Sequence, residues 1–398
     1  MENLHTSSTE VGNVFALFGK KYKHEHKLPL HQRNAMFAIE HCRTSVLGGH
    51  VDECDHCGHK RISYNSCRNR HCPKCQGLNR IKWVDKLSSN LLPVRYFHIV
   101  FTIPCELNRL TLVNQKCLYD ILFKAASETL LMLAKDKKYL YANTGLVAVL
   151  HTWGQNLMEH PHLHTLVPAG GWDENTQYWK SSRNNFFIPV KVISAVFRGK
   201  FLSMLKQYYL DNTLKFEGEI KTLGQKINFK QLLNTLYRKQ WVVYAKKPFK
   251  NASHIVAYLG RYTHRVAISN RRIIGIDGDC VIFKWRDYTD HGKQKIMRLD
   301  ATEFIRRFLL HILPKGFCKI RYFGIFASRN RKTVLTKCKN VLRYKFQKPR
   351  FDALSWQQSL KLVSGIDVSI CPMCKKGNMI RIVDFKSQRD PPDLIKNV

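Results

Sequence analysis

Hydrophobic residues gather in short runs and in helical periods, which together predict a chain of mixed strands and helices. Three runs rich in β-branched, aromatic or leucine side chains are typical of strands: residues 96–103, 146–151 and 162–167. Between the first two runs, residues 107–134 carry leucine, methionine and phenylalanine at helical spacing and predict a long amphipathic helix. Residues 272–276 and 281–286 flank an Asp-Gly-Asp turn, which predicts a β-hairpin.

The other segments are interpreted mainly as helix and loop. Residues 76–90 predict a polar helix, residues 170–240 predict loops and helices, and residues 301–312 predict a further helix. A short strand at 241–244 is expected to lead into a helix near 253–263. No internal repeat or low-complexity tract interrupts this pattern.

Composition points to a polyanionic partner. Lysine and arginine number 66 against 29 acidic residues, which gives a formal charge of +37. A surface this basic repels itself unless a polyanion neutralises it, so DNA or RNA is the expected partner. The charge is spread over the whole chain instead of one amphipathic helix, which disfavours a membrane surface. No stretch approaches the ~20 apolar residues of a membrane span, and the first residues do not resemble a signal peptide.

The cysteines between positions 42 and 75 indicate structural zinc. Cys54-x-x-Cys57 and Cys72-x-x-Cys75 form two pairs separated by 14 residues, positions 58 to 71. Four thiolates at this spacing are typical of a tetrahedral zinc site, and the 13 cysteines of the chain are expected in a reducing compartment. A closed site has no open coordination position, so this module is expected to support DNA binding and not catalysis.

Further donors leave the number of zinc ions at one or two. The additional candidate ligands around the two pairs are Cys42, His50, Cys67 and His71. The alternative is that the cysteines are small buried residues and that the histidines hydrogen-bond locally or contact phosphate. The tail pair Cys371-Pro-Met-Cys374 has no obvious second pair, so it is either half of a zinc ribbon completed in space or two free thiols.

Two histidines on one strand are candidate ligands of a second kind of metal. His162 and His164 are two residues apart, so both imidazoles would leave the same face of a strand. Gln155, seven residues upstream of His162, is the expected third ligand, with His151 and His160 as rivals. The competing interpretation is a strand with ordinary surface histidines.

A pair of tyrosines is the candidate nucleophile. Tyr258 and Tyr262 are four residues apart in the helix expected at 253–263, so their phenols would share one face. A phenolate can attack a phosphodiester and conserve the bond as a phosphotyrosine. The alternative is an amphipathic helix whose tyrosines pack on the core.

The order of these motifs carries more information than each alone. The chain contains, in sequence, Cys42-Arg-Thr-x-x-Leu-Gly-Gly-His50, Asn65-Ser-Cys-Arg-Asn-Arg-His-Cys-Pro-Lys-Cys-Gln76, Phe97-His-Ile-Val-Phe-Thr-Ile-Pro104, His160-Pro-His-Leu-His164, Tyr258-Leu-Gly-Arg-Tyr-Thr-His-Arg-Val-Ala-Ile-Ser-Asn270 and Ile320-Arg-Tyr-Phe-Gly-Ile325. This set resembles the insertion-sequence ninety-one (IS91) family of two-tyrosine rolling-circle transposases, over roughly residues 30 to 375.

The resemblance implies an α+β fold with a catalytic core. That core is a nuclease of the His-hydrophobic-His (HUH) class, an antiparallel sheet with flanking helices, preceded by a small zinc-binding domain. It makes His162 and His164 metal ligands and Tyr258 and Tyr262 nucleophiles. Two imidazoles, an amide oxygen and open positions suit Mg²⁺ or Mn²⁺.

The expected domain boundaries follow from the motifs. They are a helical extension at 1–30, the zinc-binding domain at 31–90, the nuclease core at 91–300 with a helical insertion at about 172–240, a helical region at 301–360, and a partly disordered Cys-x-x-Cys tail at 361–398.

The function implied is a metal-dependent, single-strand DNA endonuclease and strand transferase that moves its own element by a rolling-circle route. Its expected partners are single-stranded DNA at the element ends and target DNA, with no membrane and with a homo-oligomer left open, in the bacterial cytoplasm at the nucleoid. The residues expected to bind DNA phosphates are Arg261, Arg265, Arg271 and Arg272, with a further basic run at 328–332. Trp285 is a candidate stacking platform for unpaired bases.

Three alternatives remain open. A plasmid relaxase or replication initiator would use the same chemistry, although initiators often carry a helicase domain. A zinc-dependent DNA-binding regulator would use the histidines and tyrosines only structurally. An acidic-triad transposase is disfavoured because only 29 residues are acidic and nothing marks a triad.

Overall fold

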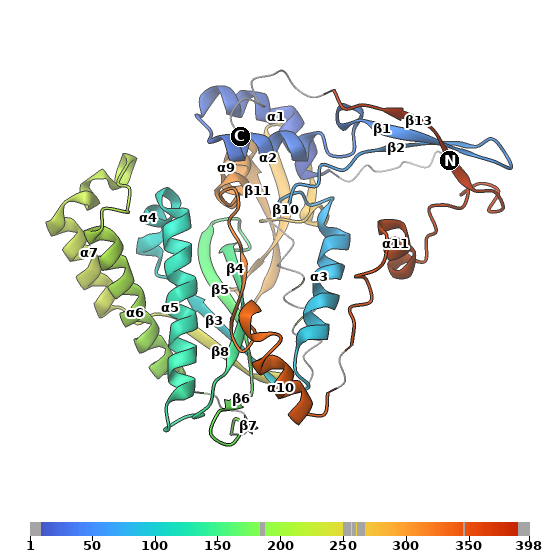
Figure 1. The fold of residues 1–398 in the computed structure, drawn as a ribbon. Coiled ribbons are helices and arrows are strands. Elements are labelled where there is room, and N and C mark those ends of the chain that lie inside the picture. Colours follow the sequence, from blue (N-terminus) through green and yellow to red (C-terminus); the bar gives the residue numbers. More distant parts are fainter. Residues whose placement is uncertain are drawn as a thin grey trace.

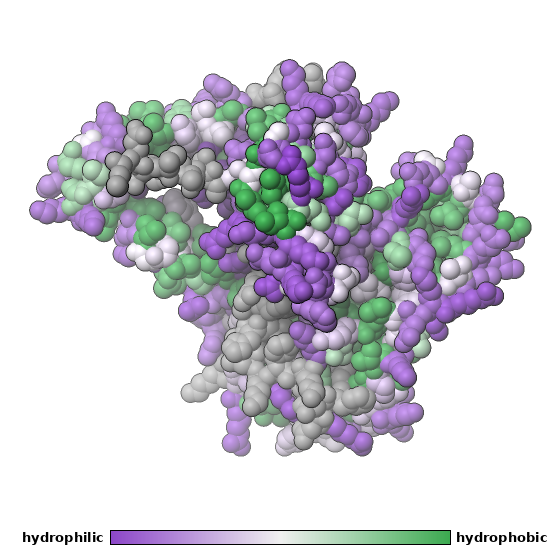
Figure 2. Space-filling model, turned by 180° about the vertical axis from the view of Figure 1, so that it is seen from behind, coloured by the Kyte–Doolittle hydropathy of each residue, from purple (hydrophilic) through white to green (hydrophobic). Residues whose placement is uncertain are grey.

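The computed structural model describes residues 9–183, 188–249, 256, 260, 267–344 and 347–388. It confirms the expected α+β class, because the described strands form antiparallel sheets flanked by helices (Figure 1). Within these ranges, no helix combines the length and the apolar character needed to cross a membrane. Hydrophilic side chains cover much of the molecule seen from behind, with apolar side chains in separate patches between them (Figure 2).

A five-stranded antiparallel sheet forms the centre of the molecule. Its strand order is β12-β4-β5-β3-β8. The strands are β3 (Tyr96–Thr102), β4 (Gly145–Trp153), β5 (Glu159–Pro168), β8 (Val243–Phe249) and β12 (Ile320–Gly324). The three strands expected between residues 96 and 167 are therefore confirmed.

One face of this sheet carries the largest hydrophobic core. It is covered by α4 (Asn108–Val113), α5 (Gln115–Lys135), α6 (Val190–Leu210) and α7 (Lys226–Arg238) (Figure 1). The single helix expected over residues 107–134 is divided into α4 and α5. The break is at Asn114, whose backbone leaves the helical region and whose side-chain amide donates to the carbonyls of Leu110 and Lys215.

The opposite face is covered at one end by α3 (Gln76–Asn90), which has the bounds expected from the sequence, and by α10 (Val334–Val341). Buried side chains of these helices pack on Tyr96, Val147 and Leu166 of the sheet. Val256, from the segment expected to form a helix, belongs to the same cluster and is fully buried.

A second sheet, which has three strands, and two amino-terminal helices lie in the upper part of the molecule in Figure 1. The sheet contains β9 (Ile273–Asp277), β10 (Cys280–Asp287) and β11 (Lys293–Asp300), so the expected hairpin is confirmed and continues into a third strand. Next comes α9 (Ala301–Leu310), against which α1 (Val11–Glu25) and α2 (Leu30–Glu40) pack. In this core the rings of Phe15 and Phe308 pack edge to face, with their centroids 5.4 Å apart.

The sequence did not predict the remaining elements. They are β1 (Gly49–Cys54), β2 (Lys60–Tyr64), β6 (Gly170–Asp173), β7 (Tyr178–Ser181), α11 (Trp356–Ser364) and β13 (Met379–Phe385). β6 and β7 form a hairpin inside the segment interpreted as loops and helices. β13 pairs with β1, so the two terminal regions share the sheet β13-β1-β2.

Candidate active site

Three histidines from two neighbouring strands meet on one face of the central sheet. His151 of β4 lies opposite His162 of β5 in the strand register, and His164 is two residues further along β5. One ligand nitrogen from each imidazole lies within 4.8 Å of the others. Three imidazoles this close can share one ion, and the short hairpin between the strands sets their spacing.

Hydrogen bonds orient two of these imidazoles. The Nδ1 atom of His162 lies 2.6 Å from the main-chain oxygen of His160, so Nδ1 carries the proton and Nε2 is left for a metal. The Nδ1 atom of His164 lies 2.8 Å from Nε2 of His98, and the two rings are stacked at 5.0 Å. His164 is therefore also turned to offer Nε2.

His98 is a site residue that the sequence interpretation missed. It lies on β3 within the recognised Phe97–Pro104 motif, is 3% exposed, and follows Tyr96 by two residues on the same strand face. Because side chains of a strand alternate between its two faces, the sequence alone could have placed His98 on the same face as Tyr96. Only the pairing of β3 with β5 places it beside His164.

Burial keeps the histidines neutral. Desolvation lowers the pKa of His162 to about 4 and that of His164 well below its ordinary value. The same cause lowers the pKa of His98 to about 4, with Lys246 adding a smaller effect. Neutral imidazoles are the form that binds metal, so the cluster is suited to a divalent ion at neutral pH.

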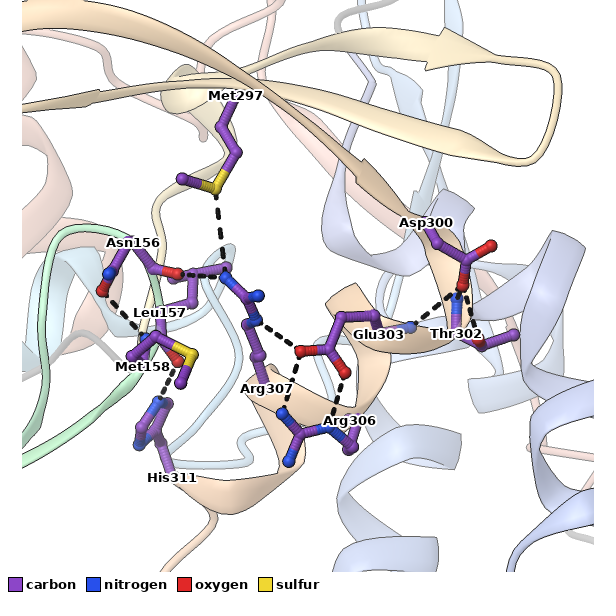
Figure 3. A network of polar contacts seen from close by, with 10 residues as sticks. All are labelled: Asn156, Leu157, Met158, Met297, Asp300, Thr302, Glu303, Arg306, Arg307 and His311. Atoms are coloured by element: carbon purple, nitrogen blue, oxygen red, sulfur yellow. Dashed lines mark hydrogen bonds and ion pairs between the residues drawn. The ribbon is translucent and has the colours of Figure 1, made fainter.

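The turn that joins β4 to β5 is held by α9 and its neighbours (Figure 3). Arg307 donates to the carbonyl of Asn156 and forms an ion pair with Glu303. The Nε2 atom of His311 lies 3.0 Å from the carbonyl of Leu157, whose side chain is fully buried and whose φ of 63° is left-handed. These contacts fix the hairpin that carries His151, His162 and His164.

Gln155, the expected third ligand, lies in this turn. Its main-chain carbonyl accepts a hydrogen bond from Arg272. The ligand nitrogen of His151, one of the two rivals, lies with those of His162 and His164, whereas His160, although its ring is also near that of His162, is not part of this group of ligand atoms. The role of Gln155 stays a prediction.

Both expected nucleophiles, Tyr258 and Tyr262, lie outside the described residues, as do Arg261 and Arg265. Their described neighbours Val256 and Gly260 are helical and buried. A Cβ added to Gly260 would lie 2.4 Å from Cγ2 of Val84, so Gly260 lies close against α3.

Two described basic positions have different surroundings. Arg271 is exposed, as a phosphate contact requires. Arg272 donates to the main-chain oxygens of Lys284 and Gln155 and lies over the ring of Phe283, so it also has a structural role. Trp285 is half-buried against the core of the β9–β11 sheet.

The cysteines form two clusters, which corrects the expected partition. Cys72 and Cys75 meet Cys42 and Cys67, whereas Cys54 and Cys57 meet the tail pair Cys371 and Cys374. The prediction of one site made by Cys54, Cys57, Cys72 and Cys75 is therefore wrong. The strand β2 and the loop after it separate the two pairs in sequence and carry them to different places.

The expected histidine ligands are absent from both cysteine clusters. His50 lies 3.5 Å from a carboxylate oxygen of Asp52. His71 accepts a hydrogen bond from the backbone N–H of Leu313, and burial lowers its pKa to about 3. Each histidine thus has a local partner in place of a metal.

The first cysteine cluster lies at the start of α3, and its side chains pack in a hydrophobic core. Cys42 follows α2, and Cys75 precedes α3 directly. The Sγ atom of Cys75 lies 3.2 Å from that of Cys42 and 3.5 Å from that of Cys67. Four cysteines in this arrangement are the donor set of a closed structural zinc site.

Comparisons with known proteins agree with this architecture. A family model described as "Transposase zinc-binding domain" matches residues 14–103, and one described as "Putative transposase" matches residues 145–333. The chain is 42% identical over 389 residues to "Putative transposase y4qJ" of Sinorhizobium fredii (strain NBRC 101917 / NGR234), covering 97% of this chain and 98% of that protein.

A second relative is more distant. The chain is 28% identical over 339 residues to "Transposase for insertion sequence element IS801" of Pseudomonas savastanoi pv. phaseolicola, covering 84% of this chain and 79% of that protein. No solved structure matches. The family's zinc-binding domain and the four-cysteine clusters both support Zn²⁺ as a bound ion. The chain belongs to the IS91 family of transposases and has that family's zinc-binding domain on its amino-terminal side.

Proposed function

We propose that this transposase nicks and rejoins single-stranded DNA at its element's ends. A divalent ion would be held by His151, His162 and His164, and Tyr258 and Tyr262 would be the nucleophiles. Transposition would follow a rolling-circle route through 5′-phosphotyrosine intermediates. The observation that carries the proposal is the cluster of three imidazoles on one sheet face.

The tyrosine assignment is supported by the position of a neighbouring residue. Val256 packs with Tyr96 and Leu166. Each of these two strand residues is two positions from a histidine of the site, namely His98 and His164, so all four side chains lie on one sheet face. Val256, two residues before Tyr258 in the sequence, therefore lies on the sheet face that carries the histidines.

The donor set favours Mn²⁺ over Mg²⁺. Mg²⁺ prefers oxygen ligands and is a poor match for three nitrogen donors, whereas divalent first-row transition ions accept imidazole, although Mn²⁺ binds nitrogen least strongly among them. Three protein ligands also leave open positions for water or phosphate oxygens. An ion bound there would polarise the scissile phosphate and stabilise the leaving 3′-oxygen.

The protein's own groups account for the covalent steps. The phenolate oxygen of one tyrosine forms a bond to phosphorus, and the bond from phosphorus to the 3′-oxygen breaks. The leaving oxygen takes up a proton and becomes a free 3′-hydroxyl. Rejoining is the reverse attack by a 3′-hydroxyl, so the bond energy is conserved and no nucleotide triphosphate is needed. The second tyrosine permits a second cleavage while the first adduct persists.

A covalent-adduct assay tests this proposal. Purified protein is incubated with Mn²⁺ or Mg²⁺ and labelled single strands from candidate element ends, and adducts that survive denaturation are counted. We expect adducts with Mn²⁺ and none after Tyr258→Phe with Tyr262→Phe or after His162→Ala. The matched control is Tyr178→Phe with Tyr288→Phe, two exposed tyrosines outside the site, which should leave the yield unchanged.

The outcomes separate the alternatives. An adduct that persists in the double variant of Tyr258 and Tyr262 would overturn the nucleophile assignment. Metal-dependent adducts on a plasmid origin, and none on element ends, would indicate a relaxase or replication initiator. Binding to DNA with no adduct on any strand would indicate a regulator.

A further inference from the structure

We infer that the second cysteine cluster is a zinc clasp that fastens the carboxy-terminal segment to the amino-terminal module. The clasp consists of Cys54, Cys57, Cys371 and Cys374, whose ligand atoms lie within 4.8 Å of one another. The matched zinc-binding domain ends at residue 103, so two of these ligands come from far outside it.

The sulfur positions fit a tetrahedral ion. The Sγ atoms of Cys54 and Cys374 are 3.7 Å apart, and so are those of Cys57 and Cys371. With a zinc–sulfur bond of about 2.3 Å, the edge of a regular tetrahedron of sulfurs is about 3.8 Å. Both distances are far longer than the ~2.05 Å of a disulfide. The spacing is that of four thiolates around one ion.

The two cysteine pairs have the same backbone geometry. In the first pair, the N–H of Gly58 donates to the carbonyl of Cys54, and in the second the N–H of Lys375 donates to the carbonyl of Cys371. Gly58 and Lys375 both have left-handed φ angles, of 69° and 57°. Each turn thus presents two sulfurs from one side of the chain.

Backbone donors and one glycine complete the arrangement. The N–H of His56 points to Sγ of Cys54, and the N–H of Gly377 points to Sγ of Cys374, each at 3.4 Å. Such donors stabilise thiolates. A Cβ on Gly377 would lie 2.5 Å from Sγ of Cys54, so the approach of the two turns requires glycine here.

The clasp lies at the end of a strand pair from opposite ends of the chain. In Figure 1, β13, drawn in red, lies beside β1, drawn in blue. Met379 pairs with Cys54 at the start of this ladder, and Phe385 pairs with Gly49 at its end. Arg61 of β2 also donates to the carbonyl of Val368. The carboxy-terminal segment therefore completes the zinc-binding domain, and zinc at the clasp should hold it in place.

Metal counting with paired variants tests the inference on the full chain. We expect Cys371→Ser with Cys374→Ser to lose one zinc ion per chain, and Cys54→Ser with Cys57→Ser to lose one as well. The quadruple variant should also lose only one, because the two pairs share an ion. The matched control is Cys105→Ser with Cys318→Ser, two exposed cysteines outside the clusters, which should lose none. Loss of two ions in the quadruple variant, or no loss in either pair, would overturn the inference.

A second measurement uses the native protein and does not depend on the folding of variants. Cys57 and Cys318 are both exposed, so without a metal both should react with N-ethylmaleimide. We expect Cys57 to be protected until a chelator is added, and then to react together with Cys371 and Cys374. Hydrogen exchange should increase in β13 on the same treatment. Equal reactivity of Cys57 and Cys318 in the zinc-loaded protein would contradict the clasp.

Discussion

At the scale of single residues, His98 is the least obvious member of the candidate active site. It is nearly fully buried and bonded to Nδ1 of His164, which leaves the Nε2 atom of His164 for a metal. Groups that orient a ligand histidine contribute to metal affinity without touching the ion. We therefore regard His98 as a positioning residue.

Substitution of His98 should weaken metal binding without removing the site. We expect His98→Phe to lower Mn²⁺ affinity by about 10- to 100-fold, the usual effect of losing such a partner. His98→Gln keeps a donor and should restore part of the affinity. Calorimetric titration with Mn²⁺ measures both. Equal affinity in the native protein and in His98→Phe would show that His98 only fills space.

Glu159 should make stability depend on pH. Burial raises the pKa of its carboxyl to about 8, and its Oε1 atom is buried with no hydrogen-bond partner among the described residues. The unfolded chain ionises this group near its ordinary pKa of about 4.5, but the folded chain keeps the proton until about pH 8. Below about pH 4.5 both the folded and the unfolded chain carry the proton, so the free energy of unfolding is highest there. Between about pH 4.5 and pH 8 only the unfolded chain loses it, so the free energy of unfolding falls as the pH rises.

Urea unfolding of the native protein and of Glu159→Gln tests this dependence. The free energy of unfolding of the native protein, relative to the variant, should fall steadily between pH 5 and pH 8 and level off above that range. A constant difference across this range would show that Glu159 ionises normally in the folded protein.

At the scale of elements, the β4–β5 hairpin and α9 form one unit. Arg307 reaches the carbonyl of Asn156 in the hairpin turn and is held by Glu303 of its own helix (Figure 3). Arg306 contacts the same glutamate, and its ion pair and hydrogen bonds to Glu303 do not involve the turn. Two adjacent arginines thus share an ion-pair partner, and one of them also contacts the hairpin.

Arg307→Met should therefore disturb the metal site, and Arg306→Met should not. Methionine keeps much of the apolar stem but cannot bond the turn, so we expect several-fold weaker Mn²⁺ binding in Arg307→Met only. Each variant loses its ion pair with Glu303, which makes Arg306→Met the control for that loss. Equal weakening in both variants would assign the effect to the ion pair instead of the turn.

Local pattern predicted much of the element structure but only part of the site. α3 and the β9–β10 hairpin follow from local spacing and turn residues, and β3 follows from its short run of β-branched and aromatic side chains, most of which are buried. The meeting of His151 with His162 depends on strand pairing. The split of the cysteines depends on Cys371, which is 314 residues from Cys57, and separation along the chain gives no sign of that contact.

At the scale of the whole molecule, α3 connects two functional regions. It starts at the first cysteine cluster, and its residue Val84 lies close to Gly260. Residues 14–103, which include α3, match the zinc-binding domain, and residues 145–333, which include Gly260, match the transposase domain, so this helix lies in one matched region and contacts the other. Zinc at the start of α3 would thereby help to position Gly260, which lies between the two proposed nucleophiles in the sequence.

The central claim is that three imidazoles hold an ion opposite the tyrosine pair. Anomalous diffraction at the manganese edge, from crystals of the full chain with Mn²⁺ and a short single strand, tests it most directly. The account predicts a manganese peak bonded to His151, His162 and His164, with a phenol oxygen of Tyr258 or Tyr262 facing the bound phosphate. A peak bonded to other residues, or both phenols on the far side of the sheet, would contradict it.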